Sequence, residues 1–305
     1  MPSVVLLILT WNGKQDTLEC LDSLDKLEYP GFWVLVVDNA STDGTVAAVR
    51  ERFPEVKLLV NERNLGYAGG NNVGIRAALE TDVDYVFILN NDIVFEDADC
   101  LLRLVEAAEV HPTGGLFGPK TYRYGEDNLL DFIGGTYSMY TGLAPSVGVD
   151  EYDRGQYETM RVYPFVNGHA VLVKRAVFET VGLFDETYFG YYEETDFCHR
   201  ARMAGFDSIY VPQARIWHKV SRAPMGELRE YLMYRNQILF VRKHATRLEK
   251  VVFSLHYALL QMPRFVAGNV LRGRWRRLRN YVRAVGWNLG VCGDGDLLVG
   301  VGGGE

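Results

Sequence analysis

Strand-length apolar runs alternate with helical patterns over the first 110 residues, and this alternation constrains the fold more than any other feature. Near-continuous apolar runs at Val4–Thr10, Trp33–Val37 and Tyr85–Leu89 are typical of parallel strands that are covered on both faces. Val56–Val60 is predicted to be the third strand in chain order, which makes Tyr85–Leu89 the fourth. The helices predicted between and after these strands are Lys14–Leu27, Thr45–Phe53, Asn71–Leu79 and Ala98–Val110. We therefore expect an α/β protein with a doubly wound, mostly parallel sheet that binds ligands at the carboxyl ends of its strands.

The pattern changes in the middle of the chain. Short β-like pieces with glycine or tyrosine turns run from Gly114 to Phe165, which predicts a strand insertion or a mobile substrate loop. A further strand is predicted at Ala170–Val173, and a helix at Glu194–Ala204 ends at Gly205.

The composition shifts again after Ser221, toward Arg-rich helical segments that break near His244 and Pro263. The last twenty residues hold eight glycines and are expected to fray. We therefore predict an α/β domain at residues 1–220, a basic helical extension at 221–285 and a flexible Gly-rich tail at 286–305.

Composition indicates a folded protein without a membrane span. Hydrophobic residues make up 48% of the chain, which is ample for a packed core, and its four cysteines show no CxxC spacing. No segment reaches the roughly 20 apolar residues that a spanning helix needs. The longest candidate, Val251–Met262, is interrupted by polar residues and followed by Pro263. A cytoplasmic protein with reduced thiols is the expectation.

Charge is distributed unevenly along the chain. Between Arg215 and Arg283 there are 16 Lys/Arg and 3 Asp/Glu, whereas the remainder has 16 basic and 36 acidic residues. No nucleic-acid-reading motif accompanies the Arg-rich stretch Arg272–Arg279, so a nucleic-acid partner is not expected. Contact with anionic phospholipid at the inner face of the cell membrane is favoured, with Trp275, Leu278 and the Val251–Leu260 face at the interface. Packing of solvated helices on the rest of the chain, or on a second copy in a homodimer, is the alternative.

Polar residues follow the first two predicted strands. Asp38 ends the second strand, where a carboxylate can accept hydrogen bonds from a nucleobase or a ribose. Thr10-Trp11-Asn12 follows the first strand, where an exposed Trp can stack on a base. Both have structural alternatives, because the Asp38 loop could cap the next helix and Trp11 could belong to the core.

The segment Asn61–Asn72 predicts a glycine-dense turn between a strand and a helix. Glycine lets the backbone approach a ligand closely, and a helix start favours an anion. The segment matches neither the P-loop nor the dinucleotide fingerprint, so a plain tight turn remains an equal interpretation.

Asn90-Asn91-Asp92 follows the fourth strand directly. A hard divalent cation prefers oxygen ligands and commonly bridges a diphosphate to one or two carboxylates, and Asp92 is placed for that role. His218, after a strand-like segment, could add a nitrogen ligand, which Mn²⁺ accepts more readily than Mg²⁺. A lone His is more often structural.

Glu193, Glu194 and Asp196 form an acidic cluster at the start of a predicted helix. One of them could deprotonate an attacking hydroxyl. The alternative is a favourable interaction of negative charge with the helix dipole. Neighbouring residues on a helix point about 100° apart, so only one of Glu193 and Glu194 should face a substrate.

Taken together, these motifs resemble family 2 glycosyltransferases of the GT-A fold, in particular the rhamnosyltransferase-like branch. The resemblance runs from about Val4 to His244. Its ordered motifs are Leu9-Thr10-Trp11-Asn12, Val37-Asp38-Asn39-Ala40-Ser41, Asn64-Leu65-Gly66, Gly69-Gly70-Asn71-Asn72, Leu89-Asn90-Asn91-Asp92, Gly182-Leu183-Phe184-Asp185-Glu186, Glu193-Glu194-Thr195-Asp196, His218 and Tyr234-Arg235-Asn236.

The resemblance implies a Rossmann-like nucleotide-binding half, an acceptor half and an inverting transfer with Mg²⁺ or Mn²⁺. Asp92 matches the last acid of the family's metal-binding DxD motif, His218 a further metal or phosphate contact, and Glu194 the catalytic base, with Glu193 and Asp196 beside it. The donor-nucleotide site would comprise Thr10, Trp11, Asn12, Asp38, Asn64, Gly66, Asn71, Asn90 and Asn91. The sugar and acceptor site would comprise Gly168, Phe184, Asp185 and Arg235.

The implied substrates are a dTDP- or UDP-linked sugar, with dTDP-rhamnose favoured, and a glycan or polyprenyl-diphosphate-linked acceptor. Two residues depart from the family pattern: Asn90 replaces the first acid of DxD, and Glu194 stands where relatives often have Asp. A sugar-1-phosphate nucleotidyltransferase is a competing enzyme class, but Thr10–Lys14 lacks the glycine-rich basic signature that it needs. A degenerate GT-A domain acting as a scaffold or binding module is the non-enzyme alternative.

Overall fold

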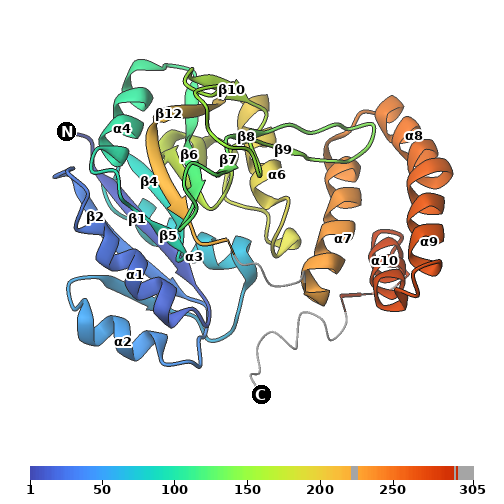
Figure 1. Ribbon diagram of the computed structural model, residues 1–305, viewed down its shortest axis with the longest axis horizontal. Coiled ribbons are helices and arrows are strands. Elements are labelled where there is room, and N and C mark those ends of the chain that lie inside the picture. Colours follow the sequence, from blue (N-terminus) through green and yellow to red (C-terminus); the bar gives the residue numbers. More distant parts are fainter. Residues whose placement is uncertain (221–225, 292, 295–305) are drawn as a thin grey trace. The chain divides into compact units, whose positions relative to one another are not determined.

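The computed structural model describes residues 1–220, 226–291 and 293–294, and the chain divides into two compact units (Figure 1). The first unit comprises Met1–Thr136, Ser146–Glu186 and Glu193–Ser221. The second comprises Tyr137–Pro145, Thr187–Tyr192 and Arg222–Glu305. Two short segments inside the first 220 residues are therefore grouped with the C-terminal helices, which the simple boundary expected at residue 220 did not foresee.

The first unit is built on one ten-stranded sheet, with a small two-stranded sheet beside it. The strand order of the large sheet is β10-β12-β6-β11-β4-β1-β2-β3, with β5 paired to β12 and β7 to β6. The strands are β1 (Val4–Thr10), β2 (Phe32–Asp38), β3 (Lys57–Val60), β4 (Tyr85–Asn90), β5 (Ile93–Val94), β6 (Gly114–Arg123), β7 (Leu130–Phe132), β10 (Arg161–Tyr163), β11 (Ala170–Lys174) and β12 (Asp207–His218), and the small sheet pairs β8 (Gly134–Gly135) with β9 (Ser146–Val147).

Four neighbouring strands, β4, β1, β2 and β3, run parallel, as the sequence predicts. Their register places Thr10 opposite Asp38 and Leu9 opposite Asn90. The polar residues that follow these strands therefore meet at one edge of the sheet, the edge at which an open α/β sheet binds ligands.

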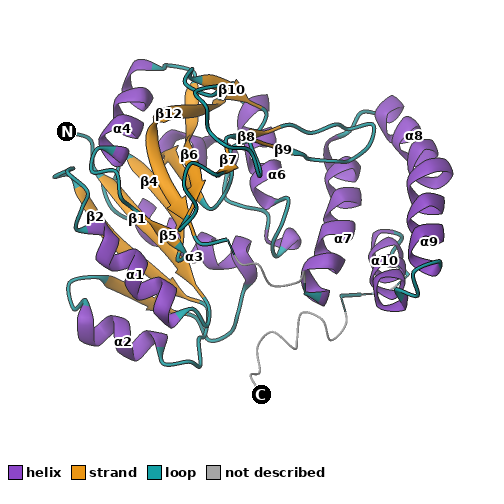
Figure 2. Cartoon of the chain, viewed as in Figure 1, coloured by secondary structure: helices purple, strands orange, loops and turns teal. Residues whose placement is uncertain are grey.

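Helices cover both faces of this sheet (Figure 2). The first unit contains α1 (Lys14–Leu24), α2 (Thr45–Arg52), α3 (Gly66–Leu79), α4 (Cys100–Val110), α5 (Arg175–Val181), the short 3₁₀ turn η1 (Glu186–Tyr188, which continues into the second unit) and α6 (Glu193–Met203). Leu6 and Ile8 join a core cluster with Leu21 of α1 and Leu104 of α4. Leu7 instead meets α3, because alternate side chains of a strand point to opposite faces.

Helix α3 begins five residues earlier than predicted, at Gly66. The glycine-dense segment that was predicted as a loop thus forms the first turns of α3, where the glycines allow close packing. A Cβ on Gly70 would come within 2.5 Å of Leu9 Cδ1, and one on Gly74 within 2.2 Å of Leu7 Cδ1. Without side chains at these positions α3 can lie directly on β1.

The other half of the sheet is mixed. β11 runs antiparallel between β4 and β6, while β6 is parallel to β12. The expectation of only short β pieces after Gly114 was incomplete, because Gly114–Arg123 is one continuous ten-residue strand. β5 pairs with the end of β12 so that Ile93 lies opposite His218, which brings His218 next to Asp92.

The described residues of the second unit are mainly helical: α7 (Glu227–His244), α8 (Arg247–His256), the π-helix η2 (Tyr257–Gln261), α9 (Met262–Val270) and α10 (Trp275–Asn288). The break at His244 is confirmed, and Thr246 begins α8 with a capping box to Glu249. Pro263 does not break the chain, because the π-turn before it absorbs the missing backbone donor and one helical run continues from Arg247 to Val270.

The C-terminal tail is ordered further than expected. Gly286 to Asn288 complete α10, and Asn288 Nδ2 donates to Arg235 O at 2.9 Å. The prediction that the chain frays from Gly286 onward is therefore wrong for residues 286–288. The expected flexibility of residue 292 and of residues 295–305 lies outside the described residues.

Candidate functional site

Asp38 stands at the carboxyl edge of the parallel strands with one oxygen unpaired. Its side chain is fully buried, and Oδ1 accepts a hydrogen bond from the Ser41 N–H at 2.7 Å. Oδ2 is buried without a hydrogen-bond partner among the described residues. The helix start that follows is held instead by Asp43, which accepts from the backbone N–H groups of Lys14 and Thr45. A helix-capping role therefore does not explain why a carboxylate is buried at position 38. The unpaired Oδ2 indicates a ligand that donates a hydrogen bond to it.

The side chains of Thr10, Trp11 and Asn12 have different surroundings. Thr10 Oγ1 is buried and bonds to Thr17 Oγ1 at 2.8 Å, while Asn91 Nδ2 donates to the same Thr17 oxygen at 3.0 Å. These contacts show that Thr10 and Asn91 support the loops, and their predicted contact with the nucleotide stays a prediction. Asn12 has a φ of 48°, and its Oδ1 accepts from the Thr42 N–H at 2.8 Å. Trp11 is 43% exposed at this edge, so its ring is available to stack on a base.

The start of α3 contributes a second unpaired acceptor. Asn64 Oδ1 accepts from the Gly66 N–H at 2.8 Å, and Gly66 has a φ of 73° that glycine adopts easily. Asn71 Nδ2 donates to Tyr67 O, but its buried Oδ1 has no partner among the described residues. Asn39, which sequence reasoning missed as a separate contact, ties this turn to β2 by donating to Gly66 O at 2.9 Å.

Asp92 and His218 do lie together, as predicted. His218 Nε2 is 3.2 Å from Asp92 Oδ2. The other ring nitrogen, Nδ1, is 2.8 Å from Asp131 Oδ2 on β7. Asn90 joins the group through its backbone, since its N–H donates to His169 O at 2.9 Å.

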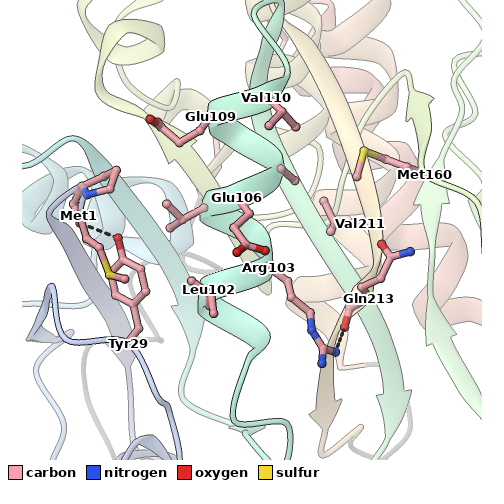
Figure 3. Close-up of a pocket in the computed structure, with 13 residues that line it drawn as sticks. Met1, Tyr29, Leu102, Arg103, Glu106, Glu109, Val110, Met160, Val211 and Gln213 are labelled. Carbon is pink, nitrogen blue, oxygen red and sulfur yellow. Dashed lines mark hydrogen bonds between the residues drawn. The ribbon is translucent and has the colours of Figure 1, made fainter.

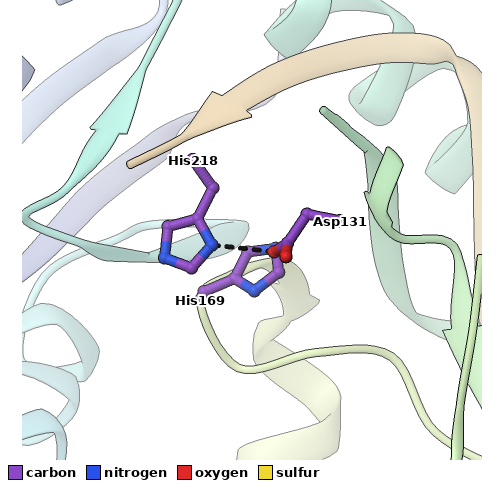
Figure 4. Close-up of side chains that lie close together, drawn as sticks. All are labelled: Asp131, His169 and His218. Atoms are coloured by element: carbon purple, nitrogen blue, oxygen red, sulfur yellow. Dashed lines mark hydrogen bonds and ion pairs between the residues drawn. The ribbon is translucent and has the colours of Figure 1, made fainter. Parts of the chain in front are cut away.

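Two further residues complete this cluster, and sequence reasoning missed both. Figure 4 shows Asp131 beside His218 and the His169 ring lying against that of His218. The two rings stack with centroids 4.7 Å apart, and His169 Nε2 is 3.0 Å from Thr121 Oγ1. Asp131 lies in the irregular insertion, where no periodicity marks it. His169 immediately precedes a buried strand, and that position was the signal available in the sequence.

The pKa values of His218 and His169 shift in opposite directions. Burial lowers the pKa of His218, but its hydrogen bonds to Asp131 and Asp92 outweigh burial and raise that pKa to about 9. Burial and the neighbouring charge of His218 lower the pKa of His169 to about 3. At neutral pH and without a bound cation, a positive His218 thus lies between two carboxylates, and His169 is neutral. A cation could bind His218 only with release of its proton.

The cluster has the donor set that a divalent cation requires. Ligand atoms of Asp131, His169 and His218 lie within 4.8 Å of one another. Asp92 Oδ1 is buried without a hydrogen-bond partner among the described residues, so it is an unused oxygen donor beside them. Carboxylate oxygens with imidazole nitrogens suit Mn²⁺ and can also hold Mg²⁺.

Glu193 and Glu194 open α6 and differ in exposure. Glu193 is 5% exposed and its Oε2 has no hydrogen-bond partner among the described residues. Glu194 is half-buried and accepts a hydrogen bond from Thr195 Oγ1 at 3.2 Å. Burial and the adjacent Glu194 charge raise the pKa of Glu193 well above its ordinary value, and burial also raises the pKa of Glu194. Burial thus favours the protonated form of Glu193, and Glu194 is the more exposed of the two carboxyl groups.

The segment Gly168–His169 joins the two acidic groups. Tyr67 Oη donates to Gly168 O at 2.5 Å, and a Cβ on Gly168 would lie 3.4 Å from Glu194 Cβ. The next residue, His169, carries the ring that stacks on His218. Gly168 thus lies beside Glu194, and the next residue stacks on His218, so this dipeptide brings Glu194 and the aspartate–histidine cluster into the same part of the first unit.

Three predicted residues have structural roles instead. Asp196 is buried in an ion pair with Arg200 at 2.7 Å, which leaves it no free carboxylate for catalysis. Phe184 is 4% exposed and packs on Phe197 in the core, with ring centroids 4.9 Å apart. Arg235 is 1% exposed inside the second unit. Its guanidinium donates to Thr187 O, Tyr188 O and Asn236 Oδ1 and pairs with Asp294. Asp185 is half-buried, and its sugar contact stays a prediction.

A separate surface pocket of about 780 Å³ lies elsewhere in the first unit (Figure 3). It is lined by Met1 and Tyr29, by Leu102 and Arg103 of α4, and by Gln213 of β12. Met1 precedes β1, so this pocket adjoins the amino end of that strand. None of the predicted site residues lines it.

Comparison with known proteins agrees with this reading. The family model described as "Glycosyl transferase family 2" matches residues 5–182. That match covers more than half of the chain, and the chain belongs to glycosyl transferase family 2.

Among curated relatives, the N-acetylglucosaminyl-diphospho-decaprenol L-rhamnosyltransferase of Mycobacterium tuberculosis is 32% identical over 202 residues. The alignment spans 61% of this chain and 66% of that enzyme, a little under two thirds. The dTDP-rhamnosyl transferase RfbF of Shigella flexneri is 24% identical over 278 residues, or 85% of this chain and 88% of that protein. The predicted family is confirmed, with rhamnosyltransferases among its relatives.

Solved structures share the fold. The mannosyltransferase PcManGT of Pyrobaculum calidifontis, in complex with GDP-Man and Mn²⁺, has a TM-score of 0.59 and 19% identity, covering 96% of this chain and 76% of that one. Residues 1–349 of TarS from S. aureus give a TM-score of 0.57 at 15% identity, covering 93% and 81% of the two chains. The predicted GT-A fold is confirmed.

Proposed function

We propose that this chain is an inverting glycosyltransferase that moves a sugar from a nucleotide-sugar donor to a hydroxyl of a cell-surface glycan or lipid-linked acceptor. Rhamnose from dTDP-rhamnose is the favoured donor, since relatives named as rhamnosyltransferases match 61% and 85% of this chain. A polyprenyl-diphosphate carrier is favoured because the name of the mycobacterial relative includes one. The observation that supports the proposal most is the position of Gly168–His169, where Gly168 lies beside Glu194 and His169 stacks on His218.

Donor binding would use the unpaired acceptors at the strand edge. Asp38 Oδ2 and Asn71 Oδ1 would accept hydrogen bonds from the nucleoside, and Trp11 would stack on the base. Mg²⁺ or Mn²⁺ held by Asp92 and His218, with Asp131 and His169 beside them, would neutralise charge on the departing diphosphate. Asn90 in place of an acid leaves this group with one charge fewer.

Glu194 would act at the other end of the site. It takes the proton of the acceptor hydroxyl while that oxygen bonds to the anomeric carbon from the face opposite the diphosphate. The bond from that carbon to the diphosphate breaks, and the nucleoside diphosphate leaves. One displacement inverts the configuration, so no covalent sugar–enzyme intermediate forms, unlike in a retaining hydrolase. Glu193 keeps its own proton and so leaves Glu194 ionised.

The test is Glu194→Gln, which removes the base and keeps the shape of the side chain. We expect transfer from dTDP-rhamnose to fall by about 10²–10⁴-fold, the usual contribution of a general base. Donor affinity, measured by thermal shift with Mn²⁺ present, should stay unchanged. Glu179→Gln, at an exposed position on α5, is the matched control and should behave as the parent.

Three results would contradict the proposal. The Glu194→Gln variant could transfer sugar at the parent rate, which would show that Glu194 is not the catalytic base. The parent could show neither transfer nor slow hydrolysis of any nucleotide sugar with Mn²⁺, which would favour a binding scaffold. Formation of a nucleotide sugar from a sugar 1-phosphate and a nucleoside triphosphate would instead favour a nucleotidyltransferase.

A further inference from the structure

The helical run Arg247–Val270 of the second unit has an unusually apolar exposed side. Its buried and half-buried side chains recur every four residues, at Phe253, Tyr257, Gln261, Phe265 and Asn269. These positions define the face that packs on the rest of the unit, including α10. The opposite face is therefore the one that the unit leaves open.

That open face consists of large aliphatic side chains at helical spacing. The exposed fractions are highest for Leu248 (68%), Leu259 (68%), Val251 (57%) and Leu255 (56%). The face, which we call the aliphatic stripe, comprises Leu248, Val251, Val252, Leu255, Leu259, Leu260, Met262, Val266 and Val270. A contiguous exposed apolar surface of this kind indicates an interaction site.

Positive charge flanks the stripe at both ends. The thirteen residues from Val251 to Pro263 contain no Asp, Glu, Lys or Arg. From Arg247 to Arg283 there are nine Lys/Arg and one acid, Glu249, which is engaged in the α8 capping box. Arg272, Arg274 and Arg276 are exposed, beside Trp275, which is 65% exposed.

We propose that the aliphatic stripe and its flanking arginines form a docking surface for an anionic lipid bilayer. An apolar face bordered by basic residues lies in the interface plane, with aliphatic side chains among the acyl chains and arginines at acidic headgroups. No described helix is long and apolar enough to cross a membrane, so the run lies on the bilayer. A second copy fits less well, because two such surfaces facing each other would bring like charges together.

The surface does not depend on the proposed activity, so a binding assay tests it separately. The full chain is floated with vesicles of phosphatidylcholine alone and of phosphatidylcholine with 30 mol% phosphatidylglycerol. We expect flotation with the anionic vesicles only, and its loss at high salt, because the charged contribution is screened.

Two variants separate the apolar and charged contributions. Leu255→Glu with Leu259→Glu alters exposed side chains and should abolish flotation while the melting temperature is kept. Arg274→Gln with Arg276→Gln should weaken binding by roughly twenty-five-fold, since each basic residue near an anionic surface contributes about a fivefold factor. Val110→Glu with Met203→Glu, at exposed positions of 70% and 75% in the first unit, is the matched control and should float as the parent does.

Failure to float with anionic vesicles, or equal flotation with neutral ones, would overturn the proposal. So would flotation of the Leu255→Glu, Leu259→Glu variant at the parent level. A concentration-dependent dimer in light scattering, lost in that same variant, would instead assign the stripe to a second copy of the chain.

Discussion

Glu193 and Glu194 are neighbours in the chain, yet their surroundings give them different chemistry. Glu193 is buried with an unpaired oxygen, whereas Glu194 is half-buried and accepts from Thr195. Sequence reasoning could reduce the base to these two residues, because a helix start with three acids is visible in the sequence. The residues alone did not distinguish the two, and it was the family resemblance that favoured Glu194. The structure adds the difference in burial between the two side chains.

Replacement of Glu193 by Gln tests this division of roles. Because the pKa of Glu193 is raised in the folded chain, its stabilising contribution is present below its ordinary value of 4.5 and is lost as pH rises through the folded value. Glu193→Gln should therefore melt higher than the parent at pH 8, by a few degrees for a change of about 1 kcal/mol, and equally at pH 4. Transfer should largely persist, because the amide keeps the shape of the side chain and leaves Glu194 in place.

Melting curves of the two proteins from pH 4 to pH 8 provide the measurement, with Glu179→Gln as the exposed control. A melting difference that grows toward acid pH would reverse the sign and contradict the assignment. Loss of transfer in Glu193→Gln as severe as in Glu194→Gln would make Glu193 the base.

The raised pKa of Glu194 also sets the acid limb of the pH–rate profile. A general base works only when ionised, so kcat/KM should rise with pH through a midpoint above 4.5. Rate measurements between pH 4 and 8 check this, with a constant concentration of Mn²⁺. If kcat/KM stayed constant from pH 4 upward, ionisation of a carboxyl group with a raised pKa would not limit the rate.

At the scale of elements, the segment before α6 is strained and firmly held. Phe189, Tyr191 and Tyr192 all have positive φ, between 62° and 72°, which side chains other than glycine rarely adopt. Asn236 of α7 donates to the carbonyl oxygens of Tyr188, Gly190 and Tyr191 at 2.7–3.0 Å. One buried amide thus fixes most of this aromatic segment, which explains the Tyr234-Arg235-Asn236 motif structurally.

Asn236→Ala should consequently destabilise the second unit. The three carbonyls lose a buried donor, and we expect about 1–3 kcal/mol less free energy of unfolding. Asn269→Ala is the matched control, because Asn269 is also buried but donates only to Phe265 O of its own helix. Urea unfolding of both variants measures the difference, and equal losses would contradict the special role of Asn236.

The elements also show where prediction from sequence succeeds. Strands β1, β2 and β4 were predictable because apolar runs of five or more residues leave little choice in an α/β pattern. The start of α3 was misplaced because Gly66, Gly69 and Gly70 resemble a turn in the sequence, although Gly70 and the following Gly74 pack against Leu9 and Leu7. Pro263 likewise predicted a break that the π-turn η2 removes.

For the molecule as a whole, the aspartate–histidine cluster ties distant parts of the chain together. His218 ends β12, Asp131 lies on β7 and Asp92 follows β4. The order of motifs predicted Asp92 and His218, because each follows a strand. Asp131 comes from an insertion without periodicity, and only tertiary structure brings it to the ring.

This cluster should make stability depend on pH. The pKa of His218 is raised from 6.5 to about 9, so the stabilisation it supplies is fully present below pH 6.5 and is lost as pH rises through about 9. The difference in melting temperature between the parent and His218→Gln, measured without added metal, should shrink over that range. A difference that widens instead would mean that the ring is neutral in the fold.

Gly168 has a consequence for any attempt to change which sugar the protein accepts. Even a methyl group there would lie 2.7 Å from Tyr67 Oη, the hydroxyl that holds the same residue's carbonyl. A larger residue at this position would therefore displace the Tyr67 hydroxyl, at 2.7 Å, before it presses on Glu194, at 3.4 Å. Protein engineers would have to shorten residue 67 first, so the two positions can only be redesigned as a pair.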